Sequence, residues 1–148
     1  CDLILRTFRK GEGHVLLGTH SFWEGVDVVG DALSCVIVAR LPFSSPGEPV
    51  LSARCEQLER EGTSGFRALS LPSAVLRLRQ GFGRLIRHRG DRGLVVIADT
   101  RILSKNYGGI FRRSLPSPVL DCPDTAAFLS QVADATILCC ISSSAGST

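Results

Sequence analysis

The sequence lacks any long hydrophobic run and any pair of cysteines spaced as in common zinc sites. Its longest apolar segments lie near residues 36–39, 94–98 and 137–141, far shorter than the ~20 residues that a membrane-spanning helix requires. The six cysteines form no C-x-x-C motif, and the three histidines lie far from them, so we expect no metal site. No signal peptide is recognisable. We therefore expect a protein of the reducing cytoplasm that has no membrane partner.

A phosphate-binding glycine loop is also missing. Residues 13–20, GHVLLGTH, have two glycines five positions apart, but they lack the lysine of a P-loop and carry His20 where serine or threonine is needed. Gly81 and Gly83 lack the third glycine of a dinucleotide-binding loop and do not follow a predicted strand. We therefore expect that the chain does not hold ATP by itself.

Acidic residues are absent from residue 62 to residue 90, and this part of the chain contains its most regular pattern. Apolar side chains recur there at spacings of three and four, which predicts a helix over residues 71–92 with one apolar face: Val75, Leu78, Phe82 and Leu85. A polar set follows the same spacings two positions later, roughly on the opposite side at ~100° per residue: Arg77, Gln80, Arg84 and Arg87.

The polar face of this predicted helix suits a polyphosphate. Gln80 and Arg87 would lie ~10 Å apart along the helix axis, and guanidinium groups bind phosphate oxygens bidentately. Gly81 and Gly83 each cost ~1 kcal/mol within a helix, which favours the close approach of another molecule to the backbone. The alternative is a solvated basic surface, although such a surface normally mixes glutamate with arginine.

The rest of the pattern predicts an α/β protein with a parallel sheet, because short apolar strands alternate with helices. Strands are expected over residues 14–19, 34–39 and 93–99, and helices over residues 2–10, 50–61, 100–115 and 124–132. The 100–115 helix should break near Gly108 and Gly109. Residues 116–123 should form a linker, and Asp124 should cap the last helix. From Ser142 on the chain is small and polar, which is typical of disorder.

Polar residues lie where ligands of such sheets bind, at the carboxyl ends of the strands. In the loop THSFWEGVD, Glu24 and Asp27 flank Gly25, which would let the loop turn tightly. Glu24 would orient an arginine and Asp27 would accept a hydrogen bond from a ribose, but turn or cap roles are about as well supported. Asp99 ends another predicted strand and Arg101 follows it, where a plain surface ion pair is the alternative.

In sequence order, these motifs resemble the second motor domain of DinG/XPD-like superfamily 2 DNA helicases. GTHSFWEGVD at residues 18–27 resembles the family's motif V, and QGFGRLIR at residues 80–87 resembles motif VI. The family order is also kept by RLPF at 40–43, LP at 71–72, DTR at 99–101, KNYG at 105–108 and SLP at 114–116. Motif VI alone is shared by many helicases, whereas SFWEGVD, RLPF and GRLIR together point to the DinG-like branch.

The resemblance implies a RecA-like, P-loop NTPase-type parallel sheet with flanking helices, here without the family's opening strand. Residues 1–131 would form a partial second motor domain, and residues 132–148, which match nothing recognised in the family, a disordered tail. Such motors bind ATP with Mg²⁺ between two lobes and move 5′ to 3′ along single-stranded DNA. The first, N-terminal lobe supplies the P-loop, the Mg²⁺-binding acids and usually an iron–sulfur cluster, none of which is expected in this chain.

Residue roles also follow from the resemblance. The γ-phosphate would be reached by the arginine fingers Arg87, the better candidate, and Arg84, with help from Gln80. The nucleotide side of the cleft would be lined by Glu24, Gly25 and Asp27. Three residues would face the DNA backbone or couple it to ATP: Thr19, His20 and Ser21. Arg101 would also contact DNA.

Two functions remain open from the sequence. The first is the C-terminal motor lobe of an ATP-dependent 5′–3′ DNA helicase, which hydrolyses ATP only together with its N-terminal lobe, so that the 148 residues alone are inactive. The second is a non-catalytic module that binds single-stranded nucleic acid through the basic face of residues 77–92. The second function predicts tight, strongly salt-dependent binding by the chain alone, and the first predicts weak binding.

Overall fold

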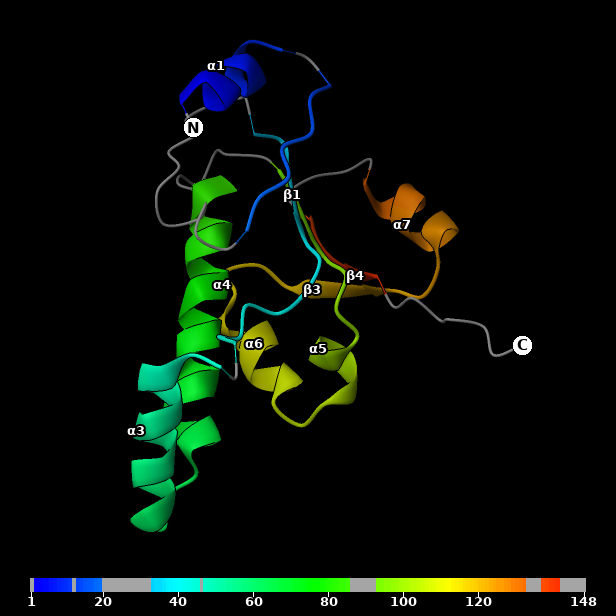
Figure 1. Cartoon of the computed structure of the whole chain (residues 1–148). Helices are drawn as coiled ribbons and strands as arrows, with labels where there is room; N and C mark the ends of the chain where they lie inside the picture. The colour runs from blue at the N-terminus through cyan, green and yellow to red at the C-terminus, as the bar shows by residue number, and fades with distance from the viewer. Residues whose placement is uncertain are drawn as a thin grey trace, which may run out of the picture.

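The computed structural model describes residues 2–11, 13–19, 33–45, 47–85, 93–132 and 137–141, and these contain a four-stranded sheet with helices on both sides (Figure 1). The strands are β1 (Cys35–Val38), β2 (Leu94–Ile97), β3 (Val119–Cys122) and β4 (Ile137–Ile141). They lie in the order β1-β2-β4-β3, and every neighbouring pair is parallel. The predicted α/β class with a parallel sheet is therefore confirmed.

The helices of the described residues are α1 (Asp2–Lys10), α3 (Pro49–Arg60), α4 (Leu71–Leu85), α5 (Arg101–Ser104), α6 (Gly108–Ser114) and α7 (Thr125–Val132). A π-helical turn, η2 (Phe66–Ser70), leads directly into α4. α4 and α7 lie on opposite sides of the sheet (Figure 1). The backbone N–H of Ala127 donates a hydrogen bond of 2.7 Å to Oδ1 of Asp124, so the predicted cap of α7 is confirmed.

The hydrophobic core lies where α4 and α6 pack on the sheet. α4 contributes the apolar stripe predicted for it, since Leu78 and Phe82 are 1% and 3% exposed and Val75 packs against the same cluster. From the sheet and the following helices, Val95, Ile97, Ile102 and Phe111 complete this core. Val96 is also buried, and the alternation of a strand directs it to the face opposite Val95 and Ile97.

The predicted strand over residues 14–19 is wrong, because the described residues 13–19 carry no regular secondary structure. Val15 and Leu17 are 82% and 87% exposed. Alternating apolar residues form a stable strand only when a neighbouring strand pairs with them and covers one face. The sequence pattern therefore located an apolar segment here, but it could not show whether a neighbouring strand pairs with that segment.

The predicted linker over residues 116–123 and the predicted disorder of the tail are also wrong in part. Residues Val119–Cys122 form the edge strand β3, and Ile137–Ile141 form β4 between β2 and β3. Both runs are short and gain their structure from pairing with distant strands, which local composition does not reveal. Residues 142–148 lie outside the described residues, and the 1–131 domain boundary stays a prediction.

The helical pieces after β2 are close to the prediction. The helix expected over residues 100–115 is divided, but the break falls at residues 105–107, and Gly108 is the first residue of α6. Cys122 is disulfide-bonded, a bond that the expectation of a reducing compartment did not include, while Cys35 and Cys55 are free thiols. Within the described ranges, no helix combines the length and the apolar character needed to cross a membrane.

Candidate functional site

A buried carboxylate joins the carboxyl ends of β1 and β2. Asp99, two residues beyond β2, is 7% exposed, and its Oδ2 accepts a hydrogen bond of 2.7 Å from the backbone N–H of Leu41, which follows β1. Nε of Arg101 donates to Oδ1 at 2.9 Å, and Nη2 of the same residue lies 2.6 Å from Oδ2. Asp99 therefore fixes both the loop after β1 and the Arg101 side chain.

The ionised form of Asp99 is favoured in this arrangement. Burial by itself raises the pKa of the Asp99 carboxyl. Hydrogen bonds from the Arg101 side chain and from the N–H groups of Leu41 and Arg101 lower it by more than burial raises it, so the net pKa lies below its usual value. The same contact raises the pKa of Arg101, chiefly through its hydrogen bond to Asp99. The pair is therefore charged at neutral pH and satisfied within the chain.

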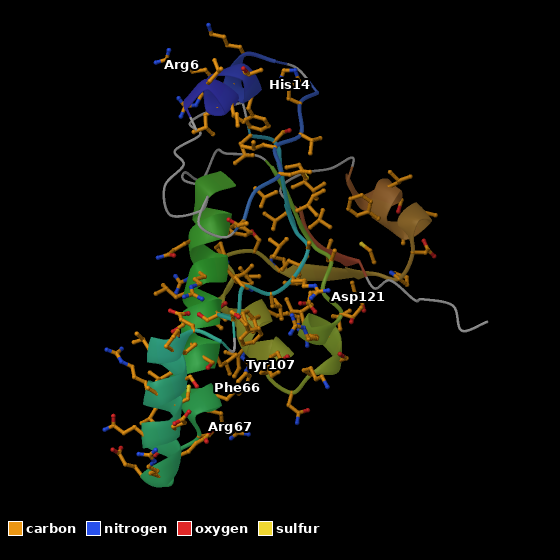
Figure 2. The ribbon with its side chains drawn as sticks, in the orientation of Figure 1. Arg6, His14, Phe66, Arg67, Tyr107 and Asp121 are labelled. Carbon is orange, nitrogen blue, oxygen red and sulfur yellow. The ribbon has the colours of Figure 1, made fainter. Side chains whose placement is uncertain are left out.

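An aromatic cluster adjoins this ion pair. Cζ of Arg101 lies 5.6 Å from the centre of the Phe43 ring, within the range of a cation–π contact. Phe43 stacks on Phe66 at a centroid distance of 5.7 Å, and Tyr107 lies 5.6 Å from Phe43 and 5.4 Å from Phe66. Figure 2 shows Phe66 and Tyr107 close together, between η2 and the α5–α6 segment. The cluster thus links the strand ends to η2.

A cavity of about 760 Å³ opens beside this cluster. Its lining comes from two segments, residues 66–71 and 104–110, and includes Phe66, Arg67, Lys105 and Tyr107. Arg67 and Lys105 are exposed, so the cavity has aromatic walls and a basic rim.

The outer face of α4 is a second candidate region. Gln80 and Gly83 are exposed, while Gly81 between them is buried. A side chain built at Gly83 would meet no atom of the described residues within 4 Å. Arg77 does not belong to this exposed face as predicted: it is half-buried, and its Nη1 donates to the Ser44 hydroxyl at 2.6 Å and to the Pro42 carbonyl at 3.5 Å. Arg77 ties α4 to the loop after β1.

Many of the predicted site residues lie outside the described residues: His20, Ser21, Glu24, Gly25, Asp27 and Arg87. Arg84 belongs to α4, but its side chain is not described. The described members come from three different parts of the fold: Thr19 is the last residue of the irregular segment 13–19, Gln80 lies on α4, and Arg101 begins α5. Their roles stay predictions.

The sequence analysis missed the residues of the cavity. A usable signal was present, because Arg67 adjoins Phe66 and Lys105 lies two positions before Tyr107. Interleaved basic and aromatic residues are typical of surfaces that bind single-stranded nucleic acid.

Residues 2–118 match the family model described as the helicase C-terminal domain. This chain belongs to the helicase C-terminal domain family. It is 51% identical over 114 residues to an ATP-dependent DNA helicase YoaA of Haemophilus influenzae, which covers 77% of this chain and 18% of that protein. It is also 46% identical over 114 residues to a 3′-5′ exonuclease DinG of Bacillus subtilis, in a match that covers 77% of this chain and 12% of that protein.

An ATP-dependent helicase DinG of Mycobacterium tuberculosis is 46% identical over 113 residues, which are 76% of this chain and 17% of that protein. This helicase C-terminal domain therefore spans less than a fifth of the length of the curated relatives it matches. The resemblance to DinG-like helicases drawn from motifs V and VI is confirmed. The matched range also includes β1, β2 and α4, so the family assignment covers the Asp99–Arg101 pair and the cavity.

Proposed function

We propose that this chain is the second, RecA-like motor lobe of an ATP-dependent DNA helicase, and that the outer face of α4 completes an ATP site begun by a first lobe. The division of α4 carries the proposal. Leu78 and Phe82 are buried, whereas Gln80 and Gly83 are exposed. A glycine costs ~1 kcal/mol within a helix, and packing against the described residues does not require one at position 83. A molecule that approaches α4 from outside would require it.

The catalytic roles in this proposal fall on the end of α4 and the residues after it. Arg84 and Arg87 follow Gln80 by four and seven positions, so a helix that continues past residue 85 would place all three on one side. Arg87 is the arginine finger, Arg84 assists it, and Gln80 orients the attacking water or the phosphate. When ATP with Mg²⁺ is bound, chiefly by the first lobe, it supplies the phosphoryl group, and these side chains stabilise its developing charge.

The remaining contacts divide between nucleotide and DNA. Glu24, Gly25 and Asp27 would line the nucleotide side of the cleft, and Thr19, His20 and Ser21 would face single-stranded DNA along which the motor moves 5′ to 3′. Arg101 is a weaker DNA candidate than the sequence indicated, because Asp99 already binds its Nε and Nη2.

ATP hydrolysis by the chain combined with a P-loop-containing first lobe tests the proposal. Replacement of the finger by Arg87→Ala should lower hydrolysis by about 10³–10⁵-fold, while circular dichroism shows an unchanged fold. Arg60→Ala is the matched control, because Arg60 is an arginine whose side chain is 81% exposed on α3. Hydrolysis by the 148 residues alone, or a normal rate for Arg87→Ala, would contradict the proposal.

The second candidate is a non-catalytic module that binds single-stranded nucleic acid through residues 77–92. The absence of acids from residue 62 to residue 90 favours it. The bonds of Arg77 to Ser44 and Pro42 weigh against it, since they remove one cation from that face. A salt titration of oligonucleotide binding separates the two, because this candidate requires tight binding by the chain alone with a steep salt dependence.

A further inference from the structure

The loop after β1, residues 41–44, is held firmly to the body of the domain. The backbone N–H of Leu41 donates a hydrogen bond of 2.7 Å to the buried carboxylate of Asp99. Phe43 packs on the core residue Phe111 at a centroid distance of 5.7 Å. The loop is therefore a fixed point at the carboxyl end of β1, and it is in place before any ligand binds.

Arg77 joins α4 to this fixed point. Its Nη1 donates to the Ser44 hydroxyl at 2.6 Å and to the Pro42 carbonyl at 3.5 Å, and its side chain is half-buried. Figure 1 shows the segment from β1 to α3, to which the loop belongs, running from the end of β1 toward α4. Two oxygens of the loop thus bind one nitrogen of the helix.

The apolar face of α4 fixes the placement of the helix less sharply than these bonds do. Leu78 and Phe82 are buried in the core, but hydrophobic burial is non-directional, so a small rotation or shift of α4 keeps most of it. Hydrogen bonds weaken steeply with distance and angle. The bonds of Arg77 therefore define the rotation and the axial position of α4.

Arg77 also lies on the side of α4 that continues into the proposed ATP face. At ~100° and ~1.5 Å per residue, Gln80 lies ~60° around the helix from Arg77 and ~4.5 Å along it. By the same geometry, Arg84 lies only ~20° around the helix and ~10 Å along it. Gln80 is exposed, so the bonds of Arg77 hold the beginning of a stripe whose next member faces outward.

We propose that Arg77 and Ser44 are positioning residues for ATP hydrolysis, which place α4 so that Gln80 and Arg84 meet the phosphate at the correct distance and angle. This inference rests on the proposed motor function. Neither residue touches the nucleotide in the proposal, because the side chain of Arg77 is occupied by the loop. A misplacement of ~1 Å in a catalytic group lowers a rate by as much as ~100-fold.

Nucleotide binding and hydrolysis by the chain combined with its first lobe test this inference. Arg77→Ala should lower kcat by about 10–100-fold and leave the KM for ATP unchanged, because the first lobe binds most of the ATP. The variant should bind ADP normally, but it should bind ADP with aluminium fluoride, a mimic of the phosphoryl group in transfer, more weakly by a similar factor. Ser44→Ala should act in the same direction, and the double variant should match Arg77→Ala, as expected when both substitutions break one contact.

The matched control for stability is Asp124→Ala. This variant loses the 2.7 Å cap of α7, which lies on the side of the sheet opposite α4 (Figure 1). It should lower the urea midpoint about as much as Arg77→Ala does, without changing kcat or the affinity for either ADP complex. A merely structural role of Arg77 would make the two variants alike.

Three results would each overturn the inference: a normal kcat for Arg77→Ala, an equal weakening of ADP with and without aluminium fluoride, or a loss of kcat in Asp124→Ala as large as in Arg77→Ala. The motor proposal is judged separately by Arg87→Ala. Normal hydrolysis by Arg87→Ala contradicts the motor itself, whereas a loss in Arg87→Ala without a loss in Arg77→Ala contradicts only the positioning role.

Discussion

Two regions of this domain differ in whether their polar groups are bonded within the chain or exposed to solvent. At the ends of β1 and β2, Asp99 and Arg101 satisfy each other, and Asp99 also binds the Leu41 N–H. On the outer face of α4, Gln80 and Gly83 are exposed, and a side chain at Gly83 would meet no atom within 4 Å in the described part of the chain. In the first region, the contacts of Asp99 and Arg101 within the chain account for both residues as stabilising groups. In the second region, no contact within the described residues accounts for the glycine at position 83. Substitutions should therefore affect folding in the first region and activity in the second.

The largest effect on folding is expected for Gly108→Ala. A methyl group at Gly108 would collide with the Ile102 carbonyl oxygen, so α5 and α6 could not keep their packing around Ile102 and Phe111, both 0% exposed. Urea denaturation should show a loss of about 3 kcal/mol or more in unfolding free energy, at the upper end of overpacking effects. Gly109→Ala is the control, because its methyl would meet only the flexible end of Arg113 at 3.1 Å. Equal losses for the two variants would refute this packing argument.

The next effect is expected for Asp99→Asn. The variant keeps an acceptor for the Leu41 N–H but removes the charge that Arg101 binds, and a hydrogen bond to a charged partner contributes ~2 kcal/mol. The Arg101 side chain is 39% exposed, so solvent screening reduces the loss toward the lower end of that range. Urea denaturation at pH 7 measures it.

Acid should erase this difference. The pKa of Asp99 is lowered in the folded state, so its stabilisation is complete above the unfolded pKa of ~3.9 and is lost as pH falls through the lower, folded value. Wild type and Asp99→Asn should therefore converge in stability below about pH 4, while Arg101 stays charged. A difference that persists unchanged at pH 2.5 would show that the charge of Asp99 does not cause it.

A smaller effect is expected for Arg77→Ala, which tests whether this arginine serves the fold or a ligand. Loss of its hydrogen bonds to Ser44 and Pro42 should cost about 1 kcal/mol. Ser44→Ala should cost a similar amount, and the double variant should lose less than the sum, as expected for a contacting pair. If Arg77→Ala leaves stability unchanged but reduces ATP hydrolysis as strongly as Arg87→Ala, Arg77 belongs to the active face after all.

The sequence predicted best the elements whose structure is set locally. α4 follows from a 3.6-residue apolar period, and β1 and β2 follow from compact apolar runs. β3 was missed because Asp121 interrupts its four residues, and β4 was missed because its apolar run adjoins a small, polar tail. The structure of both depends on pairing with other strands, which local pattern does not reveal. The helical period also placed Arg77 on the polar face, but the loop after β1 folds back and binds it.

For the site, residue chemistry was predictable and spatial grouping was not. Asp99 and Arg101 were singled out by position after a strand, yet their hydrogen bonds to each other and to Leu41 favour stability over DNA contact. Phe66 and Tyr107 lie 41 positions apart in the sequence, and only the packing of η2 against the α5–α6 segment brings their rings to 5.4 Å. No periodicity connects such a pair.

The smallest change, Gly83→Ala, gives the sharpest separation of the two regions. Since a methyl at Gly83 meets none of the described atoms within 4 Å, alanine should raise the unfolding free energy by about 0.5–1 kcal/mol through helix propensity. In the motor combined with its first lobe, the same methyl should lower ATP hydrolysis by about 10–100-fold if the other lobe or the nucleotide approaches this backbone. Gly62→Ala is the matched control: its φ of +79° should make alanine cost about 1 kcal/mol of stability without affecting hydrolysis. A stabilised Gly83→Ala protein with normal hydrolysis would remove the main structural reason for placing the ATP site on this face of α4.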